Sequence, residues 1–211
     1  MSDKLHDPSA ATDTPPVSEA IDSGRRKLAG SALGVAAIFT LSSRPVWANQ
    51  CTISGMMSGN LSKPRGPACE GCTPGYWRQC QHLDSWIGYR PSDHFNTVFG
   101  VTNYVDSVGR PYTLLDVLRG ISGNLNYGGG SGGVCALLPP GYVNNPMDSD
   151  PISPNLGFHA VAALLSAAHP SVNYGYAAGD IINLFRAHYL TNPAKLKDSL
   201  DMLNNRGCPL N

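Results

Sequence analysis

Residues 69–80, with the sequence CEGCTPGYWRQC, combine three cysteines with two large aromatic side chains. Cysteine sulfur can bind a metal, exchange electrons as a dithiol or form a disulfide, so three kinds of chemistry are open to this segment. A tetrahedral zinc site needs four ligands, and Cys69, Cys72, Cys80 and His82 could supply them. A thiol-redox site would use the Cys69-x-x-Cys72 pair. A crosslinked brace would use all three cysteines.

The surrounding sequence favours the brace. A thioredoxin-like pair opens a helix after a buried strand, whereas KPRGPA at 63–68 holds two prolines and a glycine and indicates a turn. A zinc site usually repeats the short Cys-x-x-Cys spacing farther along the chain, and no such repeat occurs here. We therefore predict disulfides and keep a metal-binding or thiol-redox protein as the alternative. The sequence alone does not decide the pairing. The six cysteines are Cys51, Cys69, Cys72, Cys80, Cys135 and Cys208.

Two other motifs match the residue pattern of known sites but lack the sequence context that those sites require. GGSGG at 129–133 fits the G-x-S-x-G pattern with Ser131 as nucleophile, but that serine must lie on a strained turn between a strand and a helix. Asp148 and Asp150 could offer oxygen ligands to calcium, yet the ligand order of an EF-hand loop is absent. We interpret the first as a glycine-rich loop and the second as a solvated turn.

The histidines form no sequence motif for a metal. His-Glu-x-x-His is absent, and the histidines after residue 48 do not share an i, i+4 face. We expect His159 and His188 to be hydrogen-bonded core or boundary residues. Convergence of His159, His188 and Asp180 across two packed helices stays open as a metal-site hypothesis. We predict no cofactor, with zinc or calcium as the alternative. The other histidines in this part of the chain are His82, His94 and His169.

The first 48 residues predict an export signal behind a disordered leader. Residues 1–22 are polar and lack a hydrophobic period. Arg25 and Arg26 then precede an apolar run. This run is shorter than the about 20 residues that a membrane-spanning helix needs. This arrangement resembles a twin-arginine signal, and Ala48 ends a stretch that a signal peptidase would cut. We expect residues 49–211 to form a single exported domain in the periplasm, at the cell surface or outside the cell.

The charge of the chain excludes several kinds of partner. The sequence holds 15 Lys or Arg and 15 Asp or Glu, and no basic block occurs after the predicted cut. Nucleic acids and anionic membranes both attract clustered cations, so neither is an expected partner. Gln50 is too large for the residue before a lipidated cysteine, so we predict no stable membrane anchor after cleavage. The remaining expectation is a protein partner or self-association.

Hydrophobic periodicity and capping signals predict a mostly α fold. Residues 49–91 read as loops with a few helical turns, and CTISGMM at 51–57 is a weak strand candidate. Two short helices follow in 92–119, the first with Ser92 as N-cap and the second with a capping box of Thr113 and Asp116. The aromatic residues of this segment should form core or a shelf against the helices; they are Tyr76, Trp77, Trp86 and Tyr89. Arg78 completes the G-Y-W-R motif.

The second half of the chain predicts a long loop and then three helices. Residues 120–155 are so rich in Gly and Pro that a long regular element is excluded, and a loop of this length is often functional. In 156–211 we expect a buried Ala-rich helix, an amphipathic helix and a last helix that Asn192 caps. The fold class is therefore a small helical domain with a disulfide-braced, loop-rich N-terminal portion and a Gly/Pro-rich insertion.

Five short stretches together resemble a group of exported bacterial proteins that share a Thr-Pro-Gly-Tyr-Trp-Lys/Arg motif. They are TPGYWRQ, FNTVFG, TLLDVL, FHAVAALLSA and LNNRGCPL, in the order that this group shows. The resemblance spans nearly the whole chain after Cys51, and it departs at Arg78, where lysine is commoner, and in the Gly-rich insertion. The group is largely uncharacterised, so the resemblance implies export and a shared fold but no catalytic residues.

These observations favour a non-enzymatic exported protein with a structural or binding role in the cell envelope or the extracellular space. The Gly/Asn/Tyr-rich loop at 120–154 is the expected contact surface, either for a partner or for other copies of the chain. Self-assembly is one version of this hypothesis.

Overall fold

The computed structural model describes Cys51, residues 68–119 and residues 147–210, together with residues 135, 137, 138, 140, 142, 143 and 145. In this part the fold is helical, and β-structure is limited to isolated bridges such as Val105 with Pro111. The predicted mostly α fold is confirmed for these residues. Three predicted features lie outside them: the leader with Arg25, Arg26 and Ala48, residues 52–57 of the strand candidate at 51–57, and Ser131.

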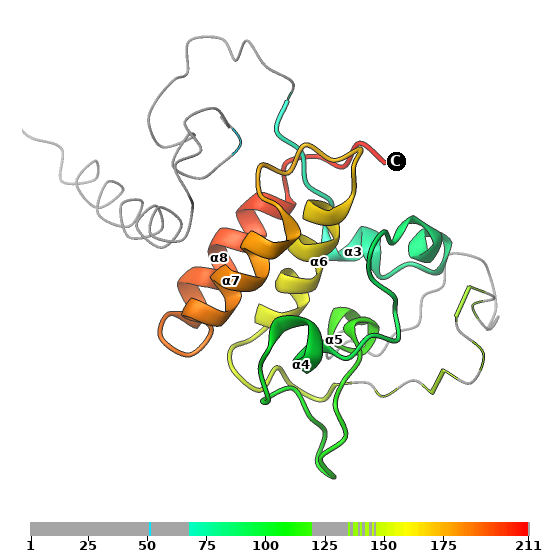
Figure 1. Ribbon diagram of the computed structural model, residues 1–211, viewed down its shortest axis with the longest axis vertical. Coiled ribbons are helices and arrows are strands. Elements are labelled where there is room, and N and C mark those ends of the chain that lie inside the picture. The colour runs from blue at the N-terminus through cyan, green and yellow to red at the C-terminus, as the bar shows by residue number, and fades with distance from the viewer. Residues whose placement is uncertain are drawn as a thin grey trace, which may run out of the picture.

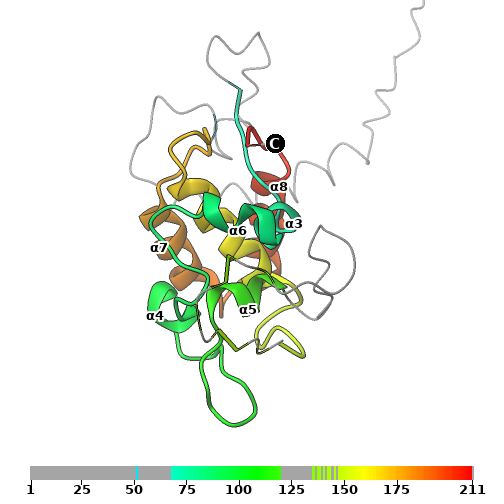
Figure 2. The same cartoon turned by 90° about the vertical axis from the view of Figure 1, so that its right-hand side faces the viewer.

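Helix α6 (Leu156–Ala168) is the centre of the structure, as its composition predicts. It contacts α3, α5, α7 and α8, and Figures 1 and 2 show these helices arranged around it. Ala160, Ala162 and Ala163 have no exposed surface. Because alanine side chains are small, neighbouring helices approach α6 closely on several sides.

Helices α7 (Ala178–His188) and α8 (Pro193–Asn204) lie side by side against α6 (Figure 1). The carboxylate of Asp180 accepts a hydrogen bond from the backbone N–H of Ala177 at 3.1 Å and so stabilises the start of α7. Asn192 lies at the N-cap of α8 as predicted, but its side chain makes no capping hydrogen bond. The apolar faces of both helices are buried and consist of Ile181, Leu184 and Phe185 on α7 and Leu196, Leu200 and Leu203 on α8.

The helix predicted with Ser92 as N-cap begins two residues later. Helix α4 spans Phe95–Phe99, and its N-cap is His94. The residues before it pair instead with the chain before α5, because Leu114 N–H donates to the Asp93 carbonyl at 2.8 Å. The start of α4 is therefore set by pairing with a segment about 20 residues away and not by the local capping preference of Ser92. Gly100 adopts the left-handed conformation, with φ of 65°, and ends α4.

Helix α5 (Leu114–Arg119) begins with the predicted capping box. The Thr113 hydroxyl accepts the Asp116 N–H at 3.1 Å, and the Asp116 carboxylate accepts the Thr113 N–H at 3.0 Å. Two further turns near the N-terminal side, α3 (Pro74–Trp77) and the 3₁₀ helix η1 (Cys80–Ser85), confirm the helical turns expected there. Across the residues that the structure describes, no helix combines the length and apolar character needed to cross a membrane.

Two glycines at equivalent helix positions should respond in opposite ways to alanine. A Cβ on Gly157 in α6 would lie 2.6 Å from Val117 Cγ1 and 2.7 Å from Tyr104 Cε1, whereas a Cβ on Gly179 in α7 would meet open space. We predict that Gly157→Ala lowers the free energy of unfolding by about 1–3 kcal/mol through overpacking. Gly179→Ala should raise it by about 0.4–1 kcal/mol by restricting the unfolded chain. Urea denaturation of both variants measures the difference, and equal shifts would contradict the packing around Gly157.

Candidate functional site

Three disulfides connect the cysteine-rich segment to the rest of the domain. They pair Cys51 with Cys69, Cys72 with Cys208 and Cys80 with Cys135, across sequence separations of 18, 136 and 55 residues. The predicted disulfides are therefore confirmed. Cys208 ties the C-terminal end of the domain to Cys72, and Cys135 ties part of the long loop to Cys80. Such crosslinks indicate an oxidising, non-cytoplasmic setting.

The structure does not bring Cys69, Cys72 and Cys80 together as a zinc or redox site. Each sulfur atom is bonded to a different cysteine, so none is a free thiol or thiolate. Zinc binding requires thiolates, and redox exchange by a Cys-x-x-Cys pair requires that the two cysteines bond to each other. The disulfide-bonded domain holds neither arrangement. Among the described residues, no cluster of three His, Cys, Asp or Glu side chains could hold a metal ion.

The Gly-Tyr-Trp segment (residues 75–77) is attached to helix α6 by hydrogen bonds to one buried hydroxyl group, that of Ser166. The Trp77 indole is completely buried, and its Nε1–H donates to Ser166 Oγ at 3.1 Å. The backbone N–H of Cys72 donates to the same oxygen at 3.2 Å, and the hydroxyl donates back to the Cys72 carbonyl at 3.4 Å. Ser166 thus satisfies the buried tryptophan and fixes the half-cystine that leads to Cys208.

The remaining aromatic residues of the motif are also placed as predicted. Trp86 is buried and donates its Nε1–H to the Trp77 carbonyl at 3.2 Å. Tyr76 is buried, and its hydroxyl donates to the Leu210 carbonyl at 3.3 Å. Arg78 points outward, with its guanidinium 6.0 Å from the centre of the Phe158 ring. The motif therefore has an inner structural part and an exposed cation at its end.

A polar pocket of about 510 Å³ lies between this segment and the C-terminal end of α8. Tyr76 and His82 both line this pocket. The imidazole of His82 stacks on the Tyr76 ring, with ring centres 3.9 Å apart and planes inclined by 20°. The other side chains that line it include Thr73, Gln79, Gln81 and Asn205. Sequence reasoning proposed His82 as a zinc ligand and did not identify the three carboxamides, since isolated Gln and Asn residues carry no motif.

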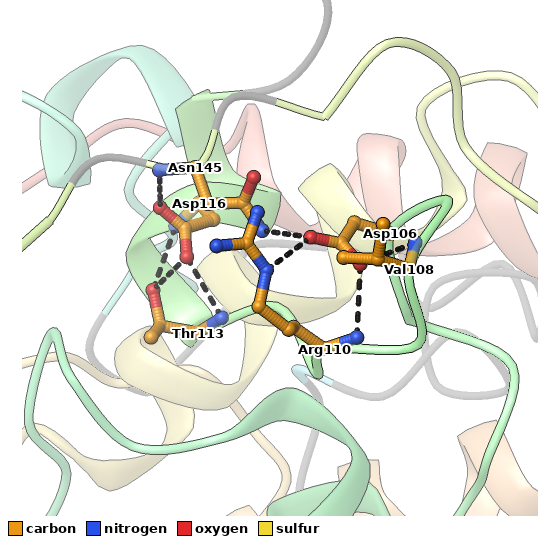
Figure 3. A network of polar contacts seen from close by, with 6 residues as sticks. All are labelled: Asp106, Val108, Arg110, Thr113, Asp116 and Asn145. Atoms are coloured by element: carbon orange, nitrogen blue, oxygen red, sulfur yellow. Dashed lines mark hydrogen bonds and ion pairs between the residues drawn. The ribbon is translucent and has the colours of Figure 1, made fainter.

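A second polar cluster attaches part of the long loop to α5 (Figure 3). The buried carboxylate of Asp116 accepts hydrogen bonds from the Tyr142 hydroxyl at 2.6 Å and from the Asn145 N–H at 3.1 Å. The Asn145 side chain also donates to Asp106 at 3.3 Å. Burial and then the hydrogen bond to Asp116 raise the pKa of Tyr142, so its hydroxyl stays protonated and donates. The cluster holds a loop in place and uses its donors and acceptors internally.

Asp106 belongs to this cluster and shapes the turn that follows it. Its carboxylate accepts hydrogen bonds from the Val108 and Arg110 N–H groups at 2.9 Å each and from Arg110 Nε at 2.7 Å. Desolvation would raise the pKa of Asp106, but the hydrogen bonds from Arg110 and Val108 lower it to about 2. The turn is therefore held by an ionised carboxylate throughout the physiological pH range.

Asp150 caps a helix, and Asp148 is exposed. Asp150 accepts the Gly157 N–H at 2.7 Å and the Tyr104 hydroxyl at 3.1 Å, and it also accepts the Ile152 and Ser153 N–H groups. One oxygen accepts from Gly157 and stabilises the start of α6, and the other holds Tyr104 and the turn before the helix. The two residues were predicted to form a turn, and the structure places Asp150 in a more specific role that its sequence position, several residues before the helix, did not reveal.

The hypothesis that His159, His188 and Asp180 converge is wrong. Asp180 lies in the first turn of α7 and His188 at its end, about 12 Å apart along the helix axis. His159 instead faces α8, with Nδ1 3.6 Å from Asp201 Oδ1. Burial lowers the pKa of His159, although Asp201 opposes this effect. It is a boundary histidine beside a carboxylate, which agrees with the simpler expectation.

Comparison with known proteins offers no relative from which a role could be transferred. No protein-family model matches the chain, and neither the curated proteins nor the solved structures contain a significant match. The resemblance to exported proteins with the Gly-Tyr-Trp motif therefore stays a prediction from sequence.

Two buried serines provide a matched test of the contact between the motif and α6. Ser166→Ala leaves two buried donors, Trp77 Nε1–H and Cys72 N–H, without an acceptor, so we predict a loss of about 2–4 kcal/mol in unfolding free energy. Ser199 is equally buried but only donates to the Lys195 carbonyl of its own helix at 2.8 Å. Ser199→Ala should cost less than about 1 kcal/mol. Urea denaturation followed by tryptophan fluorescence measures both, and equal losses would contradict the role assigned to Ser166.

Proposed function

We propose that this chain is exported and acts as a non-enzymatic binding or structural protein of the cell envelope or the extracellular space. The observation that carries the proposal is the set of three disulfides, which connect four distant parts of one small domain. Crosslinks of this kind persist in oxidising compartments and allow a loop-rich domain to keep its shape outside the cell.

The export route is supported by the order of features along the chain. All six cysteines follow Ala48, the predicted cleavage position, and the Arg25–Arg26 pair precedes it. A twin-arginine signal would deliver this domain to the compartment in which its disulfides persist.

A binding or structural role is supported by how the domain uses its chemically active side chains. Asp106, Asp116, Asp150 and Ser166 each make several hydrogen bonds within the domain, and these contacts hold loops and helix ends. The cysteines are crosslinked. These residues serve the architecture, and a rigid architecture presents a surface to a partner at low entropic cost.

The surface near the long loop supports a protein contact. Val143, within the predicted contact loop, is 78% exposed, and Val108 is 73% exposed. Val108 belongs to the segment between α4 and α5, which projects away from the helices in both Figure 1 and Figure 2. Asn145 connects the two segments by its hydrogen bond to Asp106. Val108 and Val143 are thus exposed apolar side chains on two segments that a hydrogen bond holds together. Such a surface favours docking to a partner or to another copy of the chain.

Export can be tested with a double substitution in the full chain. We predict that the unaltered protein leaves the cytoplasm and that Arg25→Lys/Arg26→Lys keeps it inside, because the pair of arginines is what the twin-arginine route recognises. Arg44→Lys changes an arginine outside the pair and is the matched control, which should be exported normally. Cell fractionation with immunoblotting measures the distribution. An unaltered chain that stays in the cytoplasm would contradict the proposed function, and normal export of the double variant would contradict the proposed route.

A further inference from the structure

The pocket beside Tyr76 and His82 has the composition of a binding site for an uncharged polar molecule. Three carboxamides and one hydroxyl line it, from Gln79, Gln81, Asn205 and Thr73. Among the residues that the structure describes, no Lys, Arg, Asp or Glu side chain contributes to its wall. An anionic ligand would therefore meet no cation, and a cationic ligand no carboxylate.

Some hydrogen-bonding groups in the pocket wall are paired with each other or with the rest of the domain. The unpaired groups are adjacent donors and acceptors. Gln81 Nε2 donates to Gln79 Oε1 at 3.0 Å, which leaves the Gln79 amide group as a donor and the Gln81 carbonyl as an acceptor. The Asn205 amide group donates to Asp201, so its carbonyl oxygen stays available. Neighbouring hydroxyl groups on a ligand both donate and accept, and they match such a set.

His82 adds a fixed planar surface to these groups. The buried Tyr76 ring, held by its hydrogen bond to Leu210, supports one face of the imidazole. Within the described part of the chain, no hydrogen bond involves the ring nitrogens of His82. The imidazole therefore presents its ring nitrogens to the pocket in a plane that Tyr76 fixes.

We propose that this pocket binds a short neutral saccharide. The volume of about 510 Å³ lies within the range of about 300–1,000 Å³ typical of small-ligand sites. A lipid would need an apolar wall, and a peptide would need apolar subsites for its side chains, whereas the aromatic surface here is limited to the stacked Tyr76 and His82. A sugar presents many hydroxyl groups around a ring and fits a wall of carboxamides and imidazole.

The inference rests on the proposed function, because it gives the exported binding protein a ligand class that occurs at cell surfaces. It also gives the Gly-Tyr-Trp segment a second role. Trp77 and Ser166 hold the segment on α6, and Tyr76 supports the histidine that faces the ligand.

Titration of sugars into the full, oxidised, exported chain tests the proposal. The probes are glucose, N-acetylglucosamine and their β-1,4-linked disaccharides at millimolar concentrations, with tetraglycine as the peptide probe. Saturation-transfer NMR detects binding, and calorimetry gives the dissociation constant. We expect at least one of the sugars to bind. His82→Ala and Gln79→Ala should each weaken that binding about fivefold to tenfold through the loss of hydrogen bonds.

Two further variants separate direct recognition from a structural effect. His82→Phe keeps an aromatic ring on Tyr76 but removes both ring nitrogens, so it should weaken binding as much as His82→Ala. Asn183→Ala, on the exposed surface of α7 and outside the pocket, should leave the dissociation constant unchanged. Near-UV circular dichroism checks that each variant is folded.

The saccharide proposal is overturned if no sugar binds the folded chain, if tetraglycine binds more tightly than every sugar, or if the pocket variants bind as well as the unaltered protein. Any of these results with a normally exported chain removes the ligand assignment and leaves the proposed function standing. Retention of the chain in the cytoplasm is a separate result that removes the proposed function itself.

Discussion

The hydroxyl of Ser166 on the central helix joins the two halves of the domain. It binds the indole of Trp77 and both backbone groups of Cys72, and Cys72 continues through its disulfide to Cys208 after the last helix. One side-chain oxygen and one covalent bond therefore connect the cysteine-rich segment, α6 and the end of α8. Because these groups are buried, each of them must be satisfied for the fold to form, and together they specify one arrangement of the segment.

The need for such connections follows from how short the helices on the N-terminal side are. Helices α3, α4 and α5 have 4, 5 and 6 residues. Isolated helices below about 12 residues are marginal in water, so these turns depend on tertiary contacts. The apolar side chains of these turns join α6, α7 and α8 in one hydrophobic core, and the disulfides and the carboxylates of Asp106, Asp116 and Asp150 add covalent and polar contacts. The short helices are therefore held by burial in a shared core as well as by crosslinks and hydrogen bonds.

The sequence predicted the features that depend on local periodicity and missed those that depend on distant partners. Regular apolar spacing revealed α6, α7 and α8, and the Thr113–Asp116 spacing revealed the start of α5. The true start of α4 follows from pairing with the chain before α5, which no local pattern records. The same limit applies to the disulfide pairing and to Ser166, whose one signal was a hydroxyl within the apolar run AVAALLSAA. The pocket wall joins residues from both ends of the domain, so its carboxamides could be recognised only in three dimensions.

Peptide mapping of the non-reduced protein by mass spectrometry tests the covalent framework most directly. We expect three crosslinked peptides that join Cys51 to Cys69, Cys72 to Cys208 and Cys80 to Cys135, with no alkylated thiol. A different pairing of Cys72 would contradict the attachment of the Gly-Tyr-Trp segment to the end of α8. Free thiols at Cys69, Cys72 and Cys80, or a metal retained in stoichiometric amount by these residues, would contradict the crosslinked architecture as a whole.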